Sequence, residues 1–246
     1  MRVVVVGASS GLGRCIGLGL AKSGASVAFL ARRRERVEGA AREAGGGAVA
    51  VGCDVTDEAG CRAAIATAAD RLGGLDALVY ATGIGPLARL TGTDAATWRR
   101  VFDTNVTGAA IATAAAIPHL TRARGTAVYL SSVSASMTPP WPGLGAYAVS
   151  KAALDKLVEA WRSEHPDVGF TRLVVGDCAG GEGDSATEFP VEWDLELAAE
   201  MHPIWSARGY LSGALIPVDD LVAAVDALLH AGATLGLPSV TITPRA

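Results

Sequence analysis

Two groups of residues in this sequence have the types and spacing for chemistry. The first is a glycine-rich turn, in which Gly7, Gly11 and Gly13 follow a run of four valines. The second is Tyr147 and Lys151, which lie four residues apart and share one face if their segment is a helix. Such a turn can hold the pyrophosphate of a dinucleotide, and a tyrosine beside an ammonium group can give or take a proton. In this order, the two groups predict an oxidoreductase that uses a nicotinamide dinucleotide.

The glycine-rich turn predicts a phosphate-binding loop. Glycine lets the backbone approach a pyrophosphate closely, and the free N–H groups of a following helix face its negative charge. The spacing is GxxxGxG rather than the commoner GxGxxG, and a chain with 30 glycines can match such a pattern by chance. The strand before the turn and the helix after it favour the functional interpretation. Cofactor contacts are therefore expected along the whole loop, from Gly7, Ser9, Ser10, Gly11, Leu12 and Gly13.

The end of the second expected strand bears on which nicotinamide cofactor is used. Many NAD-binding proteins place an acidic residue there against the ribose hydroxyls, whereas this sequence has Arg32 and Arg33. A guanidinium would pair with a 2′-phosphate, so NADP(H) is predicted in preference to NAD(H). The alternative is that these arginines only line a solvated helix start. Asp54 and Val55 could meet the adenine edge, although an aspartate after a strand is also a common helix cap.

The elements that position these residues alternate between short β-rich runs and longer helical stretches, which is typical of a parallel sheet covered on both faces. The expected strands are Arg2–Val6, Ser26–Leu30, Ala48–Gly52, Ala77–Tyr80, Thr126–Leu130, Gly169–Val175 and Ser239–Ile242. The expected helices are Leu12–Ser23, Arg33–Glu43, Glu58–Leu72, Ala95–Leu120, Ala146–Glu164 and Val218–Ala231. The predicted fold class is α/β: a three-layer α/β/α Rossmann fold with a doubly wound, mainly parallel seven-stranded sheet, in a single domain covering residues 1–246.

One stretch, residues 177–217, breaks this alternation. It is rich in glycine, proline and acidic residues, yet it carries the bulky side chains of Phe189, Trp193, Met201, Trp205 and Tyr210. A long irregular insertion of this kind predicts a lid over a substrate pocket. The alternative is a helical connector whose aromatic residues pack on the core. The acidic residues of this stretch could select a cationic or polar substrate, but a solvated loop is the better expectation for Asp177, Glu182, Asp184 and Glu188.

Composition and charge argue against several other classes of protein. A net charge of −4 without a long basic run predicts no nucleic-acid or membrane partner and favours a small molecule. The four cysteines form no CxxC pair and have no histidine at metal spacing, so neither a disulfide framework nor a metal site is expected. Ser9 and Ser10 do not lie in a GxSxG elbow, so a hydrolase finds no support. The opening apolar run is too short for a signal peptide, and a cytoplasmic location is expected.

On these residues the sequence resembles the short-chain dehydrogenase/reductase family, in its single-domain type. The resemblance covers the whole chain and is densest from residue 1 to about 175. The family's glycine motif corresponds to residues 7–13, its catalytic tyrosine and lysine to Tyr147 and Lys151, and its helix asparagine to Asn105.

The family's catalytic serine has two candidates in this sequence. The family's usual spacing before the tyrosine selects Ser134, whereas its place just after the fifth strand selects Ser132. We prefer Ser132, because the end of a strand fixes a position better than a loop that can absorb insertions, and Ser134 stays open.

The resemblance implies a role for each of these residues. Tyr147 would protonate the oxygen that forms as hydride arrives, or deprotonate an alcohol in the reverse direction. Lys151 would lower the pKa of the tyrosine and bond the nicotinamide ribose. The serine hydroxyl would hold the substrate oxygen, and Asn105 would hold a water that completes a proton relay from the lysine.

Two departures from the family's pattern fall beside the cofactor. The Asn-Asn-Ala-Gly that usually follows the fourth strand is replaced by residues 80–83, and the Pro-Gly after the sixth strand by residues 175–180. Thr187 is in a position to supply the family's usual hydroxyl contact. Including these segments, the remaining cofactor-binding residues implied by the resemblance are Ala81, Gly83, Tyr147, Lys151, Gly176 and Thr187.

The sequence thus predicts an NADP(H)-dependent carbonyl reductase or alcohol dehydrogenase that acts on a small to medium, partly apolar substrate. Two alternatives stay open. One is a nucleotide-binding protein with little turnover, and the other is an epimerase or dehydratase of the same fold that uses the cofactor transiently. The resemblance also implies a homo-oligomer, either a dimer or a tetramer.

Overall fold

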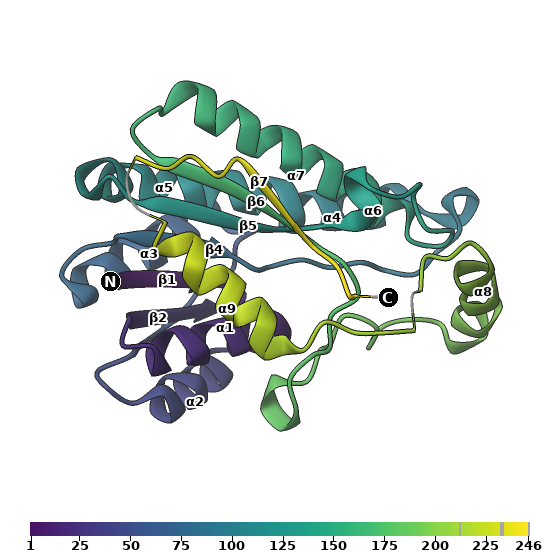
Figure 1. The fold of residues 1–246 in the computed structure, drawn as a ribbon, viewed down its shortest axis with the longest axis horizontal. Coiled ribbons are helices and arrows are strands. Elements are labelled where there is room, and N and C mark those ends of the chain that lie inside the picture. The colour runs from purple at the N-terminus through teal and green to yellow at the C-terminus, as the bar shows by residue number, and fades with distance from the viewer. Residues whose placement is uncertain (212, 232–233, 246) are drawn as a thin grey trace.

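The structure is a computed structural model that describes residues 1–211, 213–231 and 234–245. At its centre the described residues form a seven-stranded sheet in the order β3-β2-β1-β4-β5-β6-β7 (Figure 1). Neighbouring strands pair in parallel throughout, so the predicted fold class is confirmed and the sheet is wholly rather than mainly parallel. The strands are β1 Arg2–Val6, β2 Ser26–Ala31, β3 Val49–Gly52, β4 Ala77–Tyr80, β5 Thr126–Ser132, β6 Gly169–Val175 and β7 Ser239–Ile242.

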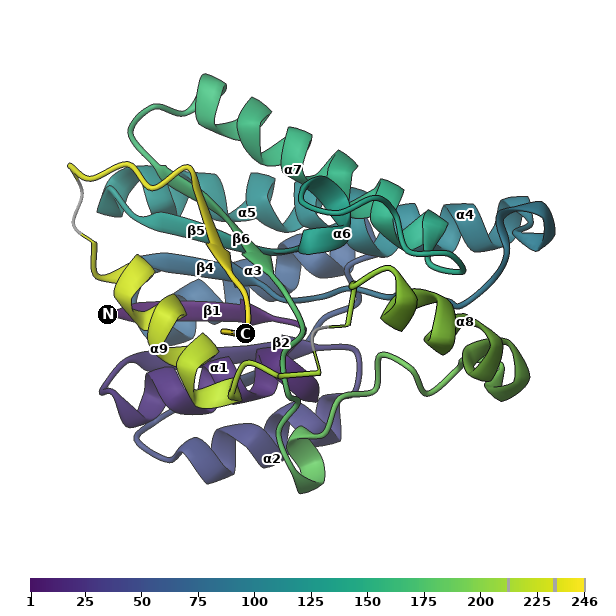
Figure 2. The same ribbon diagram turned by 45° about the vertical axis from the view of Figure 1, so that its right-hand side comes forward.

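Helices cover both faces of the sheet (Figures 1 and 2). Val4 and Val6 of β1 pack into one core with α3, α5 and α7, while Val3 and Val5 pack into the other with α1, α2 and α9. Apolar residues at successive positions are therefore buried on opposite faces, which is why the strands read as unbroken hydrophobic runs. The helices are α1 Gly11–Lys22, α2 Arg34–Ala44, α3 Glu58–Leu72, α4 Ala95–Phe102, α5 Gly108–Ala123, α6 Val133–Ser136, α7 Gly145–Glu164, α8 Leu195–Ala207 and α9 Val218–Leu229.

The order of the strands changes direction between β1 and β4. From β1 the chain adds β2 and β3 toward one edge of the sheet, and from β4 it adds β5, β6 and β7 toward the other. In doubly wound sheets a crevice opens at the carboxyl ends of the strands beside such a reversal, because the connections leave in opposite directions. The glycine-rich turn follows β1 at this end of the sheet, so the topology itself places the turn beside the crevice.

The expected helix Ala95–Leu120 is wrong in one respect. It is divided into α4, a π-helical turn over Asp103–Thr107, and α5. A π-turn inserts an extra residue into the helical repeat and is frequent at functional sites. Here the turn contains Asn105, one of the residues singled out from the sequence.

The 177–217 segment contains a helix, α8, that was not among the expected helices but agrees with the alternative of a helical connector. Asp194 caps α8 by accepting hydrogen bonds from the backbone N–H groups of Glu196 and Leu197, at 2.9 and 3.1 Å. Met201 and Trp205 of α8 are buried in a separate apolar cluster with Leu87, Trp141 and Leu144. Pro203 inside α8 explains why the stretch reads as irregular, since proline usually ends a helix. Figure 2 shows α8 beyond the carboxyl ends of the strands, away from the two main cores.

Candidate active site

A cavity of about 810 Å³ lies at the carboxyl ends of the strands. It brings together the glycine-rich turn and the tyrosine–lysine pair, which are far apart in the sequence. Of the residues proposed from the sequence, those that line the cavity are Gly7, Ser9, Ser10, Gly11, Leu12, Gly13, Arg32, Arg33, Asp54, Val55, Ala81, Gly83, Ser132, Ser134, Tyr147, Lys151, Gly176 and Thr187. Asn105 is fully buried beside the wall of the cavity rather than lining it.

The glycine-rich turn is shaped for close approach of the backbone. Gly7 has a φ of 91°, and a Cβ on it would lie 2.7 Å from the backbone nitrogen of Thr82. A Cβ on Gly13 would collide with the carbonyl oxygen of Gly7. The start of α1 is therefore pressed against the end of β1, with its N-terminal N–H groups at the cavity, and this cradle fits a dinucleotide pyrophosphate.

Replacing Gly13 by alanine is expected to destabilise the fold by about 1–3 kcal/mol and to weaken dinucleotide binding, because α1 must move away from the turn to make room. Gly39→Ala is the matched control. This position is inside α2, and an added Cβ would meet only Arg42 Nη2 at 3.9 Å, so a gain of about 0.5–1 kcal/mol is expected. Denaturant unfolding measures both changes, and a Gly13→Ala protein as stable as the parent would contradict the close packing.

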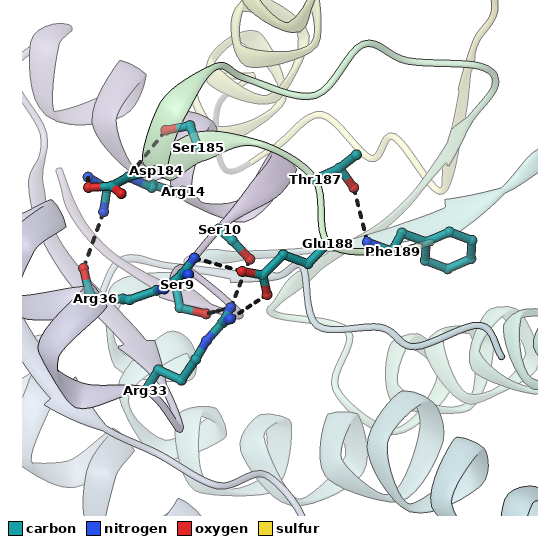
Figure 3. Close-up of polar contacts among 10 residues, drawn as sticks. All are labelled: Ser9, Ser10, Arg14, Arg33, Arg36, Asp184, Ser185, Thr187, Glu188 and Phe189. Atoms are coloured by element: carbon teal, nitrogen blue, oxygen red, sulfur yellow. Dashed lines mark hydrogen bonds and ion pairs between the residues drawn. The ribbon is translucent and has the colours of Figure 1, made fainter. Parts of the chain in front are cut away.

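The arginines after β2 lie at the same cavity. Arg33 folds back onto the glycine-rich turn, where its Nη2 donates to Ser9 Oγ at 2.8 Å and to Ser10 Oγ at 2.9 Å (Figure 3). Its guanidinium is therefore held by the glycine-rich turn, although the side chain is partly exposed. Asp54 is not a helix cap, since Asp57 caps α3; its Oδ1 closes a local turn by accepting from the N–H of Thr56 at 2.9 Å and from its hydroxyl at 2.7 Å.

Ser132 and Tyr147 meet at the other end of the cavity. The hydroxyl of Tyr147 is hydrogen-bonded to the side chain of Ser132. Ser134 lies behind Ser132, with their two Oγ atoms 2.9 Å apart, and its N–H donates to Ser132 Oγ at 3.2 Å. Of the two serines left open by the sequence, Ser132 is thus the one in contact with the tyrosine, because β5 extends to this residue.

In the structure burial is the dominant influence on the pKa of Tyr147, and the effect of Lys151 on the phenolate stays a prediction. Burial raises the pKa of Tyr147 to about 12, against the opposing hydrogen bond from Ser132, because the phenolate would lose its hydration. The Lys151 ammonium lies 5.8 Å from the centre of the tyrosine ring and donates instead to the Leu130 carbonyl at 2.7 Å. Burial therefore favours the protonated form of the Tyr147 hydroxyl.

Lys151 is itself perturbed by burial. It is 4% exposed, and desolvation lowers its pKa to about 8 against the opposing charge of Asp155. Asp155 is buried four residues further along α7, and one of its oxygens lies 3.6 Å from Arg172 Nη1. Sequence reasoning missed Asp155, although its i,i+4 spacing from Lys151 was a usable signal.

The side chain of Asn105 is hydrogen-bonded to the loop after β4. Its Oδ1 accepts from the N–H of Ile84 at 2.9 Å, and its Nδ2 donates to the Ile84 carbonyl at 2.9 Å and to Ser150 Oγ at 2.8 Å. Ser150 Oγ in turn donates to the Tyr147 carbonyl at 2.7 Å. The Asn105 side chain therefore braces this loop against α7, in a region where the family's usual asparagine is missing. A water-holding role for Asn105 stays a prediction.

Aromatic and aliphatic side chains form the wall of the cavity near Tyr147. Phe189 packs edge-on against the tyrosine ring, with the ring centres 5.0 Å apart. Trp193 Nε1 donates to the Gly85 carbonyl at 2.8 Å, which ties the 177–217 segment to the loop after β4. Trp141 and Leu144 complete this wall. A substrate that reaches Tyr147 would therefore lie against apolar groups.

The helices of the described part of the chain include none that is both long enough and apolar enough to cross a membrane.

Comparisons with known proteins agree with this geometry. A sequence profile described as short chain dehydrogenase matches residues 1–180. A protein from Sesamum indicum named 11-beta-hydroxysteroid dehydrogenase A is 37% identical over 180 residues, which is 71% of this chain and 51% of that relative. The chain thus spans about half the length of this curated relative.

Solved structures repeat the whole fold. A short-chain type dehydrogenase/reductase from Mycobacterium marinum superposes with a TM-score of 0.82 and 27% identity, covering 98% of this chain and 93% of the other. An alcohol dehydrogenase from Thermococcus sibiricus, solved with 5-hydroxy-NADP, superposes with a TM-score of 0.80 over 100% of this chain and 99% of the other, at 24% identity. With most of its length matched in sequence and nearly all of it in structure, the chain belongs to the short-chain dehydrogenase/reductase family of oxidoreductases, which use nicotinamide cofactors.

Proposed function

We propose that this protein is an NADP(H)-dependent carbonyl reductase or alcohol dehydrogenase that acts on a small to medium, partly apolar substrate. The observation that carries the proposal is that one cavity contains both groups of residues. The serine, tyrosine and lysine lie at one end, and the glycine-rich turn, bonded to the Arg33 guanidinium, lies at the other.

Each side chain of the site has a task in this reaction. When bound, NADPH supplies the hydride that reduces the carbonyl carbon. Ser132 holds the carbonyl oxygen, and Tyr147 donates its hydroxyl proton to that oxygen as negative charge develops on it. The Lys151 ammonium stabilises the phenolate that remains on Tyr147, and Asn105 keeps the loop after β4 and α7 in register.

The protonation state of Tyr147 suits its proposed role as the proton donor in carbonyl reduction. With a pKa of about 12, the hydroxyl carries its proton throughout the physiological range. In the reverse direction the same residue would take the proton from an alcohol.

The 177–217 segment is the proposed lid. Phe189, Trp193 and Val191 place apolar surface on the cavity beside Tyr147, which supports a substrate with an apolar body next to its carbonyl group. Closing this segment over the site would also exclude water from the reacting groups.

The choice of cofactor is tested by titrating the purified protein with NADPH and NADH. Removing the guanidinium with Arg33→Ala is expected to weaken NADPH binding roughly ten- to hundredfold and to leave NADH binding almost unchanged, because a charged hydrogen-bonded pair with the 2′-phosphate is lost. Arg32→Ala is expected to have a smaller effect in the same direction, since Arg33 is the one held by Ser9 and Ser10.

Arg34→Ala is the control for charge alone, because Arg34 is exposed and paired with Glu38 on α2. Equal losses of NADPH and NADH affinity in Arg33→Ala would contradict a 2′-phosphate site.

A further inference from the structure

Residues Ala186–Phe189 of the proposed lid run along the cofactor side of the cavity. The N–H of Gly11, at the start of α1, donates to the Ala186 carbonyl at 3.2 Å. Thr187 lies 3.6 Å from the point where a Cβ on Gly11 would be. Glu188 reaches the arginines after β2, and Phe189 packs on Tyr147. Four consecutive residues therefore connect the phosphate loop to the proton donor.

Glu188 bridges two arginines. Its Oε1 accepts from Arg36 Nη1 at 2.7 Å, and its Oε2 accepts from Arg33 Nη1. The same Arg33 guanidinium donates through its Nη2 to Ser9 and Ser10 of the phosphate loop. Figure 3 shows the carboxylate between the two guanidinium groups, with Phe189 pointing away from them. From the sequence, Glu188 is expected in a solvated loop. The structure shows its carboxylate ion-paired with two arginines instead.

A carboxylate and a phosphate make the same kind of contact with arginine, since both offer oxygens that accept charged hydrogen bonds. Glu188 therefore lies where an anion bound to Arg33 and Arg36 would lie. We propose that Glu188 is a cofactor-specificity residue that competes with the 2′-phosphate of NADP(H) for these arginines, and whose release draws Phe189 away from Tyr147. This inference rests on the proposed function.

The strength of the existing ion pairs permits such an exchange. The side chains of Arg33, Arg36 and Glu188 are 42%, 44% and 31% exposed, so each pair is partly hydrated and weak. A phosphate monoester near neutral pH carries more charge than a carboxylate and has three acceptor oxygens, so it wins the arginines when it is held nearby. NADH carries only a neutral hydroxyl at the 2′ position, which cannot replace the Glu188 carboxylate, so Glu188 would stay paired.

The chain before Glu188 is held more firmly. Arg14 is 3% exposed, donates to Ser185 Oγ at 3.2 Å, and is paired with Glu43 at 2.6 Å. Because Ala186 is also bonded to the Gly11 N–H, release of Glu188 would move the chain after Ala186 rather than detach the segment. Phe189 follows Glu188 directly and fills its place closely, since a Cβ on Gly85 would collide with its ring. A shift of the backbone at Glu188 would therefore be passed directly to the contact between Phe189 and Tyr147.

Titration of intrinsic fluorescence with NADPH and with NADH tests the competition. Glu188→Gln keeps the size of the side chain and removes its charge, so NADPH is expected to bind roughly three- to tenfold more tightly, as fits the loss of two weak ion pairs. NADH affinity is expected to change less than twofold. Glu192→Gln is the matched control, because Glu192 is in the same segment and pairs with Arg100 at 2.8 Å. NADPH affinity that is unchanged or weaker in Glu188→Gln overturns the inference.

Hydrogen exchange gives a second readout that does not depend on turnover. The amides of Phe189, Val191 and Trp193 donate within this segment, at 3.3, 3.1 and 3.0 Å. Saturation of the parent protein with adenosine 2′,5′-bisphosphate is expected to speed their exchange, and saturation with adenosine 5′-monophosphate is not. Neither probe carries a nicotinamide that could order the segment again. Equal exchange with the two nucleotides overturns the release of Phe189.

These experiments separate this inference from the proposed function. NADPH binding that Arg33→Ala weakens and Glu188→Gln leaves unchanged overturns only the role of Glu188. Failure of the parent and of Glu188→Gln to bind either cofactor overturns the proposed function, and this inference with it.

Discussion

Replacing Tyr147 by phenylalanine is expected to lower kcat for NADPH-dependent carbonyl reduction by roughly 10²–10⁴-fold, the range typical of a lost general acid. The change removes one oxygen atom and leaves the ring that packs against Phe189. Affinity for NADPH is therefore expected to stay within a few-fold of the parent value, so the loss falls on the chemical step. Steady-state kinetics against a panel of ketones and aldehydes, with NADPH titration of the same preparation, makes the measurement.

Tyr210→Phe is the matched control for this change. Tyr210 belongs to the same segment and stacks on Trp141 with ring centres 5.5 Å apart, away from the Ser132–Tyr147 contact. Its loss of a hydroxyl is expected to leave kcat unchanged. If Tyr147→Phe bound NADPH tightly and retained full activity, the tyrosine would not be the proton donor. Tight NADPH binding with no turnover by the parent protein on any carbonyl tested would favour a nucleotide-binding role.

Lys151→Met is expected to lower kcat by roughly 10²–10³-fold, because the phenolate formed on Tyr147 loses its nearest cation. The pKa of about 8 also predicts that the parent enzyme loses reductase activity as the pH rises through 8, when Lys151 gives up its charge. The rate of reduction by the parent, measured as a function of pH, tests this loss of activity. A rate that does not change between pH 7 and pH 10 would contradict it.

Lys151 also makes the free energy of unfolding depend on pH. Its pKa falls from the ordinary 10.5 to about 8 on folding, so between these values the unfolded chain binds a proton that the folded chain does not. The cost of the buried ammonium is present in full below pH 8 and disappears as the pH rises toward 10.5. Relative to Lys151→Met, the free energy of unfolding of the parent is therefore expected to rise by about 3 kcal/mol across this window.

Lys156→Met is the control for this measurement, since Lys156 is exposed on the same helix and paired with Glu159. Its unfolding free energy is expected to follow that of the parent with pH. Denaturant unfolding at several pH values compares the three proteins, and parallel profiles for the parent and Lys151→Met would mean that the lysine is hydrated.

Local patterns predicted the strands well and the irregular helices poorly. The seven expected strands are observed with ends that differ by at most two residues, because short β-branched runs between turn residues are strong local signals. The extension of β5 to Ser132 was not predicted, and it is what brings that hydroxyl to Tyr147. The π-turn at Asn105 and helix α8 were not among the expected elements, because neither gives a recognisable spacing of apolar residues in the sequence.

The sequence alone was enough to predict the parallel α/β architecture, the glycine-rich turn and the placement of Tyr147 and Lys151 on one helix face. These follow from short-range sterics and from the helical repeat, which act between residues close together in the chain. Other features follow only from the folded arrangement: burial raises the pKa of Tyr147 and lowers that of Lys151, Asn105 is bonded to Ile84, and Glu188 pairs with Arg33. Desolvation and ion pairing depend on what the folded chain places around a group, and those neighbours come from distant segments that no local pattern encodes.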